Sequence, residues 1–249
     1  MNRHAAGVDT LMLTATRILT FAQERALTNA SGFFFARAGR LFLVTSRHVL
    51  VDEPSGHFPD RLEVELHVDA DNLASSIGFS FPLYRNRRSL WRQGADTTGD
   101  IDVAVIEIDR SAWPAAAVYR AFTPAHLLLP PASIEVGTTL LVVGFPLGFH
   151  DALHHMPVVR HAVLASSFGL RFQGEGYFLT DARTHRGTSG APVVMRTANP
   201  DPALGDLPWK LAGIHSARLD LGGRDRVLDE ALGLNCAWYA DILETLTVN

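Results

Sequence analysis

The chain has 249 residues, of which 47% are hydrophobic and 19% are charged, and its formal net charge is −4. This length fits one large all-β unit or two small barrels, and the apolar content is enough for a buried core. The slightly acidic balance, with acidic and basic residues interspersed, argues against nucleic acid as a partner.

The single cysteine and the lack of long apolar runs limit where we expect the protein to work. With Cys236 alone, no intrachain disulfide can form, which argues against a disulfide-stapled secreted scaffold. The first residues lack the apolar segment and cleavage site of a signal peptide. No apolar run approaches the ~18–20 residues that span a bilayer. We therefore expect a cytoplasmic protein with no membrane partner.

Short segments rich in Val, Ile, Leu, Phe and Thr, bounded by Gly, Pro, Asn or Asp, dominate the chain and predict β-strands. They cover residues 11–21, 31–46, 61–70, 101–109, 138–146, 157–168, 176–182, 191–195 and 211–217. Their spacing indicates an all-β protein built from antiparallel barrels or a sandwich. The loops predicted between them cover residues 52–60, 85–100 and 196–209.

Few helices are expected, and one connector divides the chain. Residues 46–50 fit a single turn, and residues 236–248 form a closing amphipathic helix with its apolar side chains on one face. The Pro- and Ala-rich segment 111–133 separates two β-rich halves. We predict an N-terminal unit over residues 1–115, a connector over 116–133 and a C-terminal unit over 134–249.

Three segments together supply the parts of a nucleophilic site. A serine hydroxyl needs a base, an acid that orients the base, and donors for the oxyanion. "TSRHVL" offers His48, "GDIDVAVIEID" offers Asp102, and "RGTSGAP" offers Ser189, with the N–H groups of Gly187 and Ser189 as donors. Each residue alone is more typical of a structural or turn position, whereas their joint occurrence in the order His, Asp, Ser indicates a triad.

The order of these residues argues against an α/β-hydrolase. That fold places the serine before the acid and the histidine, with a helix after the nucleophile. Here the histidine comes first, and "GAPVV" puts Pro192 and β-branched residues where that helix would run.

The segments "TSRHV", "DIDVAVIEI" and "TDARTHRGTSGAPVV" resemble the trypsin/chymotrypsin-fold serine proteases, especially the bacterial HtrA/Deg-type protease domain without a PDZ module. "IEVGTTLLVVGFPLG", "LAGIHSA" and "LGLNCAWYADILETL" are similar to the same group. The resemblance extends from Ala30 to Leu246. It implies two antiparallel six-stranded β-barrels with a C-terminal helix, and an active site between the barrels.

The resemblance also implies a role for each residue of the triad. His48 acts as general base and then as general acid, Asp102 orients it, and Ser189 is the nucleophile beside an oxyanion hole of Gly187 and Ser189. Asp100 remains an alternative orienting acid. No cofactor is expected, and no metal either, because the spacing of His154 and His155 fits no standard ligand set.

Position within the family motif also implies a specificity pocket. Arg183 occupies the position of the pocket floor and Thr184 follows it, while Ile214, His215 and Ser216 lie on the strand along the cleft. A His and a Thr at these positions imply cleavage after Glu, Gln or Asp. In the alternative, Arg183 points to solvent, His215 packs in the core, and the pocket takes small apolar residues.

Two departures from the family bear on regulation. Thr188 stands where digestive members have the Asp that binds a new N-terminus, so activation by that route is not expected. The interval from His48 to Asp102 is long, so residues 85–100 form either an added regulatory or binding element or a merely tolerated surface loop. We expect a serine endopeptidase that acts on proteins or peptides, with a possible protein activator. The alternative is a latent or non-catalytic protease-fold module that binds a protein partner.

Overall fold

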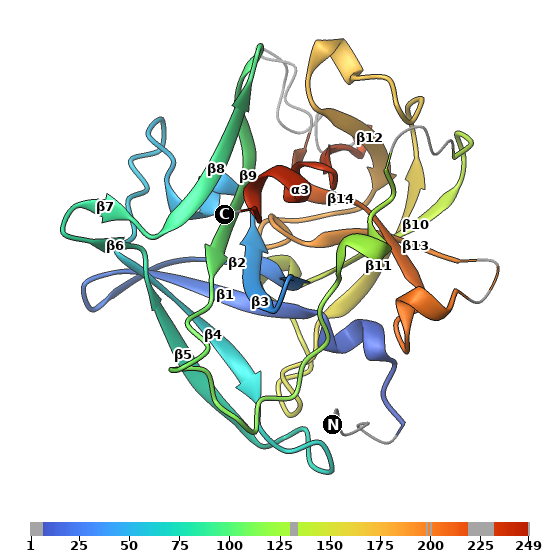
Figure 1. Ribbon diagram of the computed structural model, residues 1–249. Helices are drawn as coiled ribbons and strands as arrows, with labels where there is room; N and C mark the ends of the chain where they lie inside the picture. Colours follow the sequence, from blue (N-terminus) through green and yellow to red (C-terminus); the bar gives the residue numbers. More distant parts are fainter. Residues whose placement is uncertain (1–6, 130–133, 198, 200, 219–231, 249) are drawn as a thin grey trace.

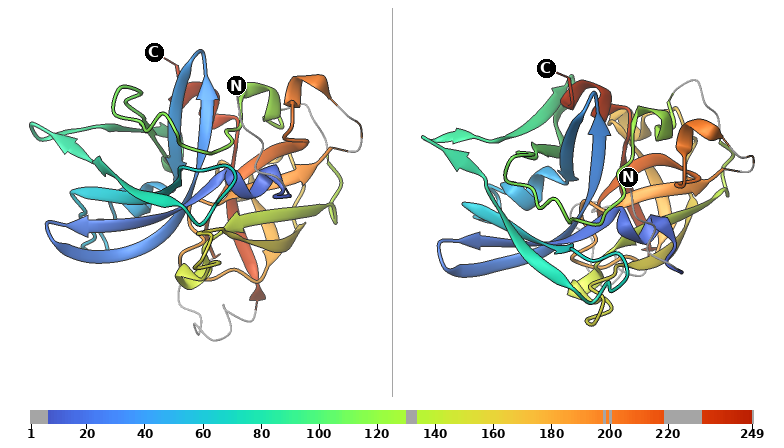
Figure 2. Two further views of the ribbon diagram at one scale, coloured as in Figure 1. Left: turned by 90° about the horizontal axis from the view of Figure 1, so that it is seen from below. Right: turned by 60° about the horizontal axis from the view of Figure 1, so that its bottom comes forward.

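The computed structural model describes residues 7–129, 134–197, 199, 201–218 and 232–248. Two β-rich halves lie side by side, the first in blue to green and the second in yellow to red (Figures 1 and 2). Strands make up most of the regular structure, so the predicted all-β class is confirmed. No described helix is long and apolar enough to cross a membrane.

The first half is an antiparallel sheet of seven strands in the order β5-β4-β1-β2-β3-β9-β8. Its strands are β1 (Ala15–Ala22), β2 (Arg25–Arg37), β3 (Arg40–Thr45), β4 (Arg61–His67), β5 (Ser76–Pro82), β8 (Trp91–Asp96) and β9 (Gly99–Glu107). On β4, Leu62, Val64 and Leu66 are buried, whereas the residues between them are partly exposed. Such alternation is the pattern that a half-buried strand requires.

The sheet of the first half is open, so the six-stranded barrel expected here is not confirmed. A small exposed hairpin joins its edge strands β5 and β8, and its strands are β6 (Tyr84–Arg85) and β7 (Arg88–Ser89). Asn86 and Arg87 both have positive φ, which makes a tight hairpin turn. The hairpin carries three arginines, and the residues of its two strands are exposed. At its base, Leu90 N–H donates to Leu83 C=O at 2.9 Å.

Two predicted segments of this half need correction. Residues 31–46 form a hairpin, because Ala38 and Gly39 adopt positive φ between β2 and β3. Residues 85–100, predicted as a loop, contain β7, β8 and the start of β9. β8 pairs with β9 from Trp91↔Ile106 to Asp96↔Gly99. As an edge strand, β8 carries polar residues that hide the strand pattern.

The second half is the closed six-stranded barrel that the resemblance implied, with strand order β10-β11-β12-β15-β14-β13. Its strands are β10 (Thr139–Gly144), β11 (Val158–Leu164), β12 (Tyr177–Ala182), β13 (Pro192–Arg196), β14 (Trp209–Arg218) and β15 (Leu234–Tyr239). Antiparallel pairing of β10 with β13, including Leu141↔Val194, closes the ring. Leu140, Val142, Phe178 and Val193 are fully buried inside it.

The C-terminal helix is shorter than predicted and packs against the first half. Residues 234–239 are strand β15, and only α3 (Ile242–Leu246) is helical. In Figure 1 this red helix lies against the green strands β8 and β9. Arg92 of β8 donates to Leu246 C=O at 3.3 Å and to Val248 C=O at 2.6 Å. Leu243 and Leu246 are buried in a core cluster that draws residues from both halves.

The remaining helical turns are short. They are α1 (Arg47–Leu50) and the 3₁₀ turns Thr10–Leu13, Pro124–His126, Pro146–Gly148, Phe172–Gly174 and Pro202–Leu204. α1 confirms the single turn predicted after β3. The connector reaches the second half through Leu128 N–H, which donates to Leu211 C=O at 3.0 Å.

Candidate active site

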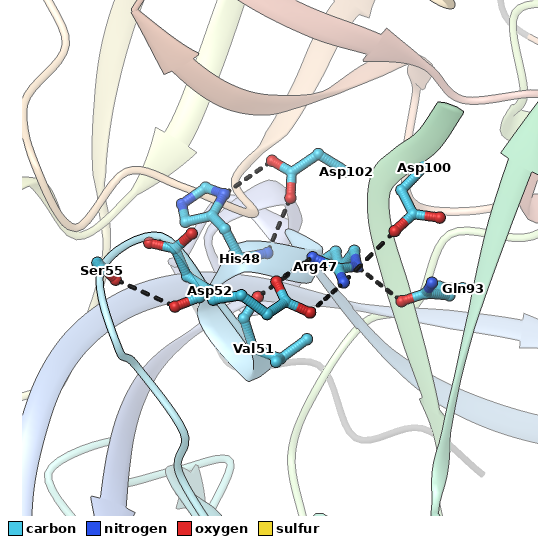
Figure 3. A network of polar contacts seen from close by, with 9 residues as sticks. Arg47, His48, Val51, Asp52, Ser55, Gln93, Asp100 and Asp102 are labelled. Carbon is cyan, nitrogen blue, oxygen red and sulfur yellow. Dashed lines mark hydrogen bonds and ion pairs between the residues drawn. The ribbon is translucent and has the colours of Figure 1, made fainter. Parts of the chain in front are cut away.

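His48 and Asp102 form a directly bonded pair. His48 lies on α1, the single turn that follows β3, and Asp102 lies on β9. The backbone N–H of His48 donates to one carboxylate oxygen of Asp102 at 2.8 Å, and its Nδ1 lies 2.7 Å from the other (Figure 3). With both oxygens engaged, the carboxylate fixes the orientation of the imidazole and favours a proton on Nδ1.

A third donor to Asp102 comes from the second half. The hydroxyl of Ser216, on β14, donates to the same Asp102 oxygen that faces the imidazole. The carboxylate therefore accepts three hydrogen bonds, and they tie α1, β9 and β14 together. Charge-assisted hydrogen bonds of this kind are the stronger ones in proteins, so the pair is held firmly.

The surroundings of His48 act on its pKa in opposite directions. Burial lowers the pKa, because it disfavours the charged imidazolium. The hydrogen bond that His48 donates to Asp102, the negative charge of Asp102 and the charge of Asp52 raise the pKa and prevail, so the net pKa lies above its ordinary value of 6.5. His48 is thus a stronger base than a free imidazole.

Asp100, the alternative orienting acid, has a different partner. Its carboxylate lies 3.4 Å from the guanidinium of Arg47, which also contacts Glu53 at 2.9 Å and Gln93 at 2.8 Å (Figure 3). This network connects α1 to β8 and β9. The acid that faces His48 is Asp102, as we preferred from the sequence.

The turn that carries Ser189 requires glycine on both sides of Thr188–Ser189. Gly187 has φ +91° and Gly190 has φ +85°, a region that residues with a side chain rarely adopt. There is also no room for a Cβ. One on Gly187 would lie 2.4 Å from Asn29 Oδ1, and one on Gly190 would lie 2.2 Å from Ser31 O.

Two hydrogen bonds hold the peptide groups next to Gly187. Leu147 N–H donates to Arg186 C=O, and the Ser31 hydroxyl donates to Gly187 C=O at 2.7 Å. The N–H and C=O of a trans peptide point in opposite directions. Because Arg186 C=O faces Leu147, the Gly187 N–H points away from that loop. Among the described residues, neither Gly187 N–H nor Ser189 N–H has an acceptor, so both can donate to an oxyanion.

Ser189 lies in the same cavity as Ser216, which bonds the His48–Asp102 pair. A cavity of about 270 Å³ is lined by Thr184, His185, Arg186, Ser189, His215, Ser216 and Ala217. Ser216 therefore lines the cavity of Ser189 and bonds Asp102 as well. Within the part of the chain that the structure describes, no hydrogen bond joins the Ser189 hydroxyl to His48. In proteases such contacts often shorten only when substrate binds.

The structure separates the residues predicted to bind substrate into two groups. Thr184, His215 and Ser216 line this cavity. Arg183, expected at the pocket floor, is exposed and does not line it, whereas Arg186 does. Ile214 is fully buried in the shared core, so its side chain is not available to a substrate. The exposed Arg183 agrees with the alternative in which it points to solvent, and the role of Ile214 in substrate binding stays a prediction.

Sequence reasoning missed two polar residues that support the site. The Ser31 hydroxyl accepts from Phe145 N–H at 3.0 Å and donates to Gly187 C=O, which connects β2 to the segment after β10 and to the Ser189 turn. Asn235 is fully buried on β15 and accepts a hydrogen bond from the Thr184 hydroxyl. An asparagine inside an apolar strand is a usable signal, whereas nothing distinguishes Ser31 in "ASGFFF".

The predicted site residues can be compared with the metal-ligating groups and the other cavities of the described residues. Among the described residues, no group of three or more His, Cys, Asp or Glu is arranged to hold a metal ion. Two larger hollows border the segment from Arg110 to Arg120, but none of the predicted site residues lines them.

Comparisons with known proteins identify the family of the chain and solved structures with a similar fold. Residues 30–199 match the family described as the trypsin-like peptidase domain, a range that includes His48, Asp102 and Ser189. The fold is similar to the serine endoprotease from Yersinia pestis, with a TM-score of 0.53 and 15% identity over 94% of this chain and 61% of that one. It is also similar to the active form of the Rv3671c protease from M. tuberculosis, with a TM-score of 0.50 and 12% identity over 95% of this chain and 80% of that one. The chain thus spans about three fifths of the Yersinia structure. No curated protein matches the sequence.

Proposed function

Since the chain belongs to the family of trypsin-like peptidase domains, we propose that it is a serine endopeptidase with a His48–Asp102–Ser189 triad. The observation that carries the proposal is the doubly bonded His48–Asp102 pair, joined through Ser216 to the cavity of Ser189. A base held by a carboxylate next to a serine is the arrangement that acyl transfer requires.

The proposed reaction has two steps. Nε2 of His48 accepts the proton of the Ser189 hydroxyl as its oxygen attacks the carbonyl carbon, and the N–H groups of Gly187 and Ser189 bind the oxyanion. His48 then gives the proton to the departing amine, which leaves an acyl group on Ser189. Water, deprotonated by His48, hydrolyses that ester and regenerates the serine. Asp102 stabilises the imidazolium in both steps.

The proposed substrates are proteins or peptides with Glu, Gln or Asp before the cut. Thr184 and His215 line the cavity next to Ser189, and the imidazole of His215 can hydrogen-bond a carboxylate or a carboxamide. Arg186 adds a positive charge at the cavity in place of the predicted Arg183. The cytoplasmic location expected from the single cysteine is part of the same proposal.

The second candidate function is a gated or non-catalytic module that binds a protein partner. The observation in its favour is the missing hydrogen bond between Ser189 and His48 within the described residues. A partner that moves the Arg186–Gly190 turn by a small distance would complete the triad.

A fluorophosphonate probe and a peptide library test these readings. We expect the wild-type protein to be labelled on Ser189 and to cut the library after a narrow set of residues, and Ser189→Ala to do neither. Labelling only in the presence of a cell extract would favour gating, and absence of labelling under both conditions would refute the protease proposal. Cuts that are mainly after Val or Ala would refute the polar pocket and leave the triad intact.

A further inference from the structure

The two hydroxyl groups in the cavity next to Ser189 have already committed their protons. The Thr184 hydroxyl donates to Asn235 Oδ1, and the Ser216 hydroxyl donates to Asp102. A hydroxyl has a single proton and two acceptor lone pairs. Toward anything else, both oxygens can therefore only accept.

The direction of the bond between Thr184 and Asn235 follows from the other end of the amide. Asn235 Nδ2 lies 2.8 Å from Ala182 C=O and 2.8 Å from Gly233 C=O. Carbonyl oxygens cannot donate, so the NH₂ group must be at this end, and Oδ1 must face Thr184. Asn235 is fully buried, and water is not available to replace these bonds. Thr184 must therefore be the donor.

We propose that Asn235, acting through Thr184, makes this cavity select an uncharged carboxamide, glutamine or asparagine, over a carboxylate in the residue before the cut. A carboxamide NH₂ can donate to the committed hydroxyls, and its oxygen can accept from the imidazole of His215, which also lines the cavity. The proposal rests on the proposed protease function and narrows its substrate class.

A side chain of either charge fits the cavity less well than a carboxamide does. A carboxylate has only acceptors, so next to Thr184 and Ser216 it would lose its hydration without gaining donors there. A lysine or arginine would find acceptors, but none of the described residues that line the cavity is acidic. The positive charge of Arg186 favours a carboxylate, but this residue is exposed, so water and salt screen its effect.

The test compares kcat/KM for peptides that are identical except for Gln, Glu, Asn or Asp before the cut. We expect each amide to exceed its acid by at least about tenfold, because a site built around specific hydrogen bonds rejects the wrong partner strongly. His48 serves all four peptides equally, so general damage to the catalytic site cancels in the ratio. A wild-type protein that cuts after the acids as well as or better than after the amides overturns the proposal.

Variants of Thr184 and Asn235 separate the proposed role in specificity from a purely structural role. Thr184→Val removes the hydroxyl at constant size and should bring the amide-to-acid ratio close to one, whereas Thr184→Ser should restore it. The matched control is Thr180→Val on β12, since Thr180 is also buried and its hydroxyl has no partner among the described residues. Its ratio should equal that of the wild type. Asn235→Leu should lower the ratio, and it should have no further effect on the ratio when added to Thr184→Val.

A binding measurement decides the proposal even if the protein cuts nothing. Ser189→Ala is titrated in a calorimeter with peptides that end in Gln or Glu and are otherwise identical, because a product peptide places its last side chain in this cavity. We expect the peptide ending in Gln to bind at least about tenfold more tightly. Equal binding, or binding of neither peptide, overturns the proposal. Failure of cleavage with selective binding refutes only the protease activity.

Discussion

The His48–Asp102 pair and the Ser189 turn are held in opposite ways. In the pair, the functional side chains bond each other, and Asp102 accepts three hydrogen bonds. In the turn, the bonds go to the carbonyl groups of Arg186 and Gly187, and the groups that face substrate remain available. The difference fits the proposed chemistry, because the base must be held in one orientation and start from one tautomer, whereas an oxyanion hole must leave its donors unsatisfied until charge develops.

The largest effect is expected from removing the carboxylate that holds His48. Asp102→Asn should lower kcat by about 10⁴-fold, because an amide NH₂ facing Nδ1 stabilises the wrong tautomer. Steady-state kinetics with a chromogenic peptide measure this loss of kcat. Asp100→Asn is the matched control and should stay close to wild type. A large loss in the control together with an active Asp102→Asn would transfer the orienting role to Asp100.

The turn is broken by removing the hydroxyl that clamps it. Ser31→Ala leaves Gly187 C=O and Phe145 N–H without their partner, so the Gly187 peptide is less well aligned with the oxyanion. We expect kcat to fall by about 10-fold to 100-fold with little change in KM, which is less than the loss of an oxyanion donor itself. Ser76→Ala is the control, because it also removes one hydroxyl hydrogen bond, to Glu65 at 2.6 Å, far from the site. A Ser31→Ala protein with normal kcat would show that the Ser31 hydroxyl is not needed to align the Gly187 peptide.

As the pH rises through the pKa of His48, activity should increase whereas the stability contributed by the His48–Asp102 pair should decrease. His48 must be neutral to accept a proton, so kcat/KM should rise about tenfold per pH unit up to its raised pKa and then level off. The inflection should lie above 6.5. Bonding to Asp102 favours the protonated form, so its contribution to the free energy of unfolding is complete below the unfolded pKa. That contribution is lost as the pH rises through the folded pKa. An inflection below 6.5 would show that burial prevails over Asp102.

The smallest effect is expected from the outer contacts of α1. Arg47→Gln removes the ion pairs with Glu53 and Asp100 but leaves both bonds between His48 and Asp102. Partly exposed ion pairs contribute about 0–1 kcal/mol, so the melting temperature should change slightly and kcat very little. Thermal unfolding and a steady-state assay measure both. A large loss of kcat would mean that Arg47, and not Asp102 alone, positions His48.

Local patterns made part of this structure predictable. The strands of the second half have buried residues on one face and clear turn residues, and the glycines around Ser189 mark positions that require positive φ. His48 could be singled out because it follows a strand, and Ser189 because glycines flank its turn, whereas Asp102 lies within β9. Their joint role as a triad stays a prediction. The direction of a side chain was harder to predict, as Arg183 and Ile214 show.

Long-range contacts made the rest unpredictable. Whether seven strands close into a ring depends on how β5 and β8 meet, and residues 85–100 carry no apolar alternation that would reveal an edge strand. The helix predicted over residues 236–248 begins with a strand, because pairing of β15 with β12 and β14 outweighs the helical pattern of Trp238 and Ile242. Ser31 supports the turn from a part of the chain more than 150 residues away.

The position of α3 also bears on when the protein matures during its synthesis. A ribosome releases the N-terminal half first, and domains generally fold in that order. Here the first sheet receives part of its cover from Leu243 and Leu246, and the third donor to Asp102 is Ser216. A nascent chain that holds His48 and Asp102 alone therefore has an uncovered apolar surface and an incomplete site. If the proposed protease function holds, activity should therefore appear only after Ser216, Leu243 and Leu246 have been synthesised and packed against the first half.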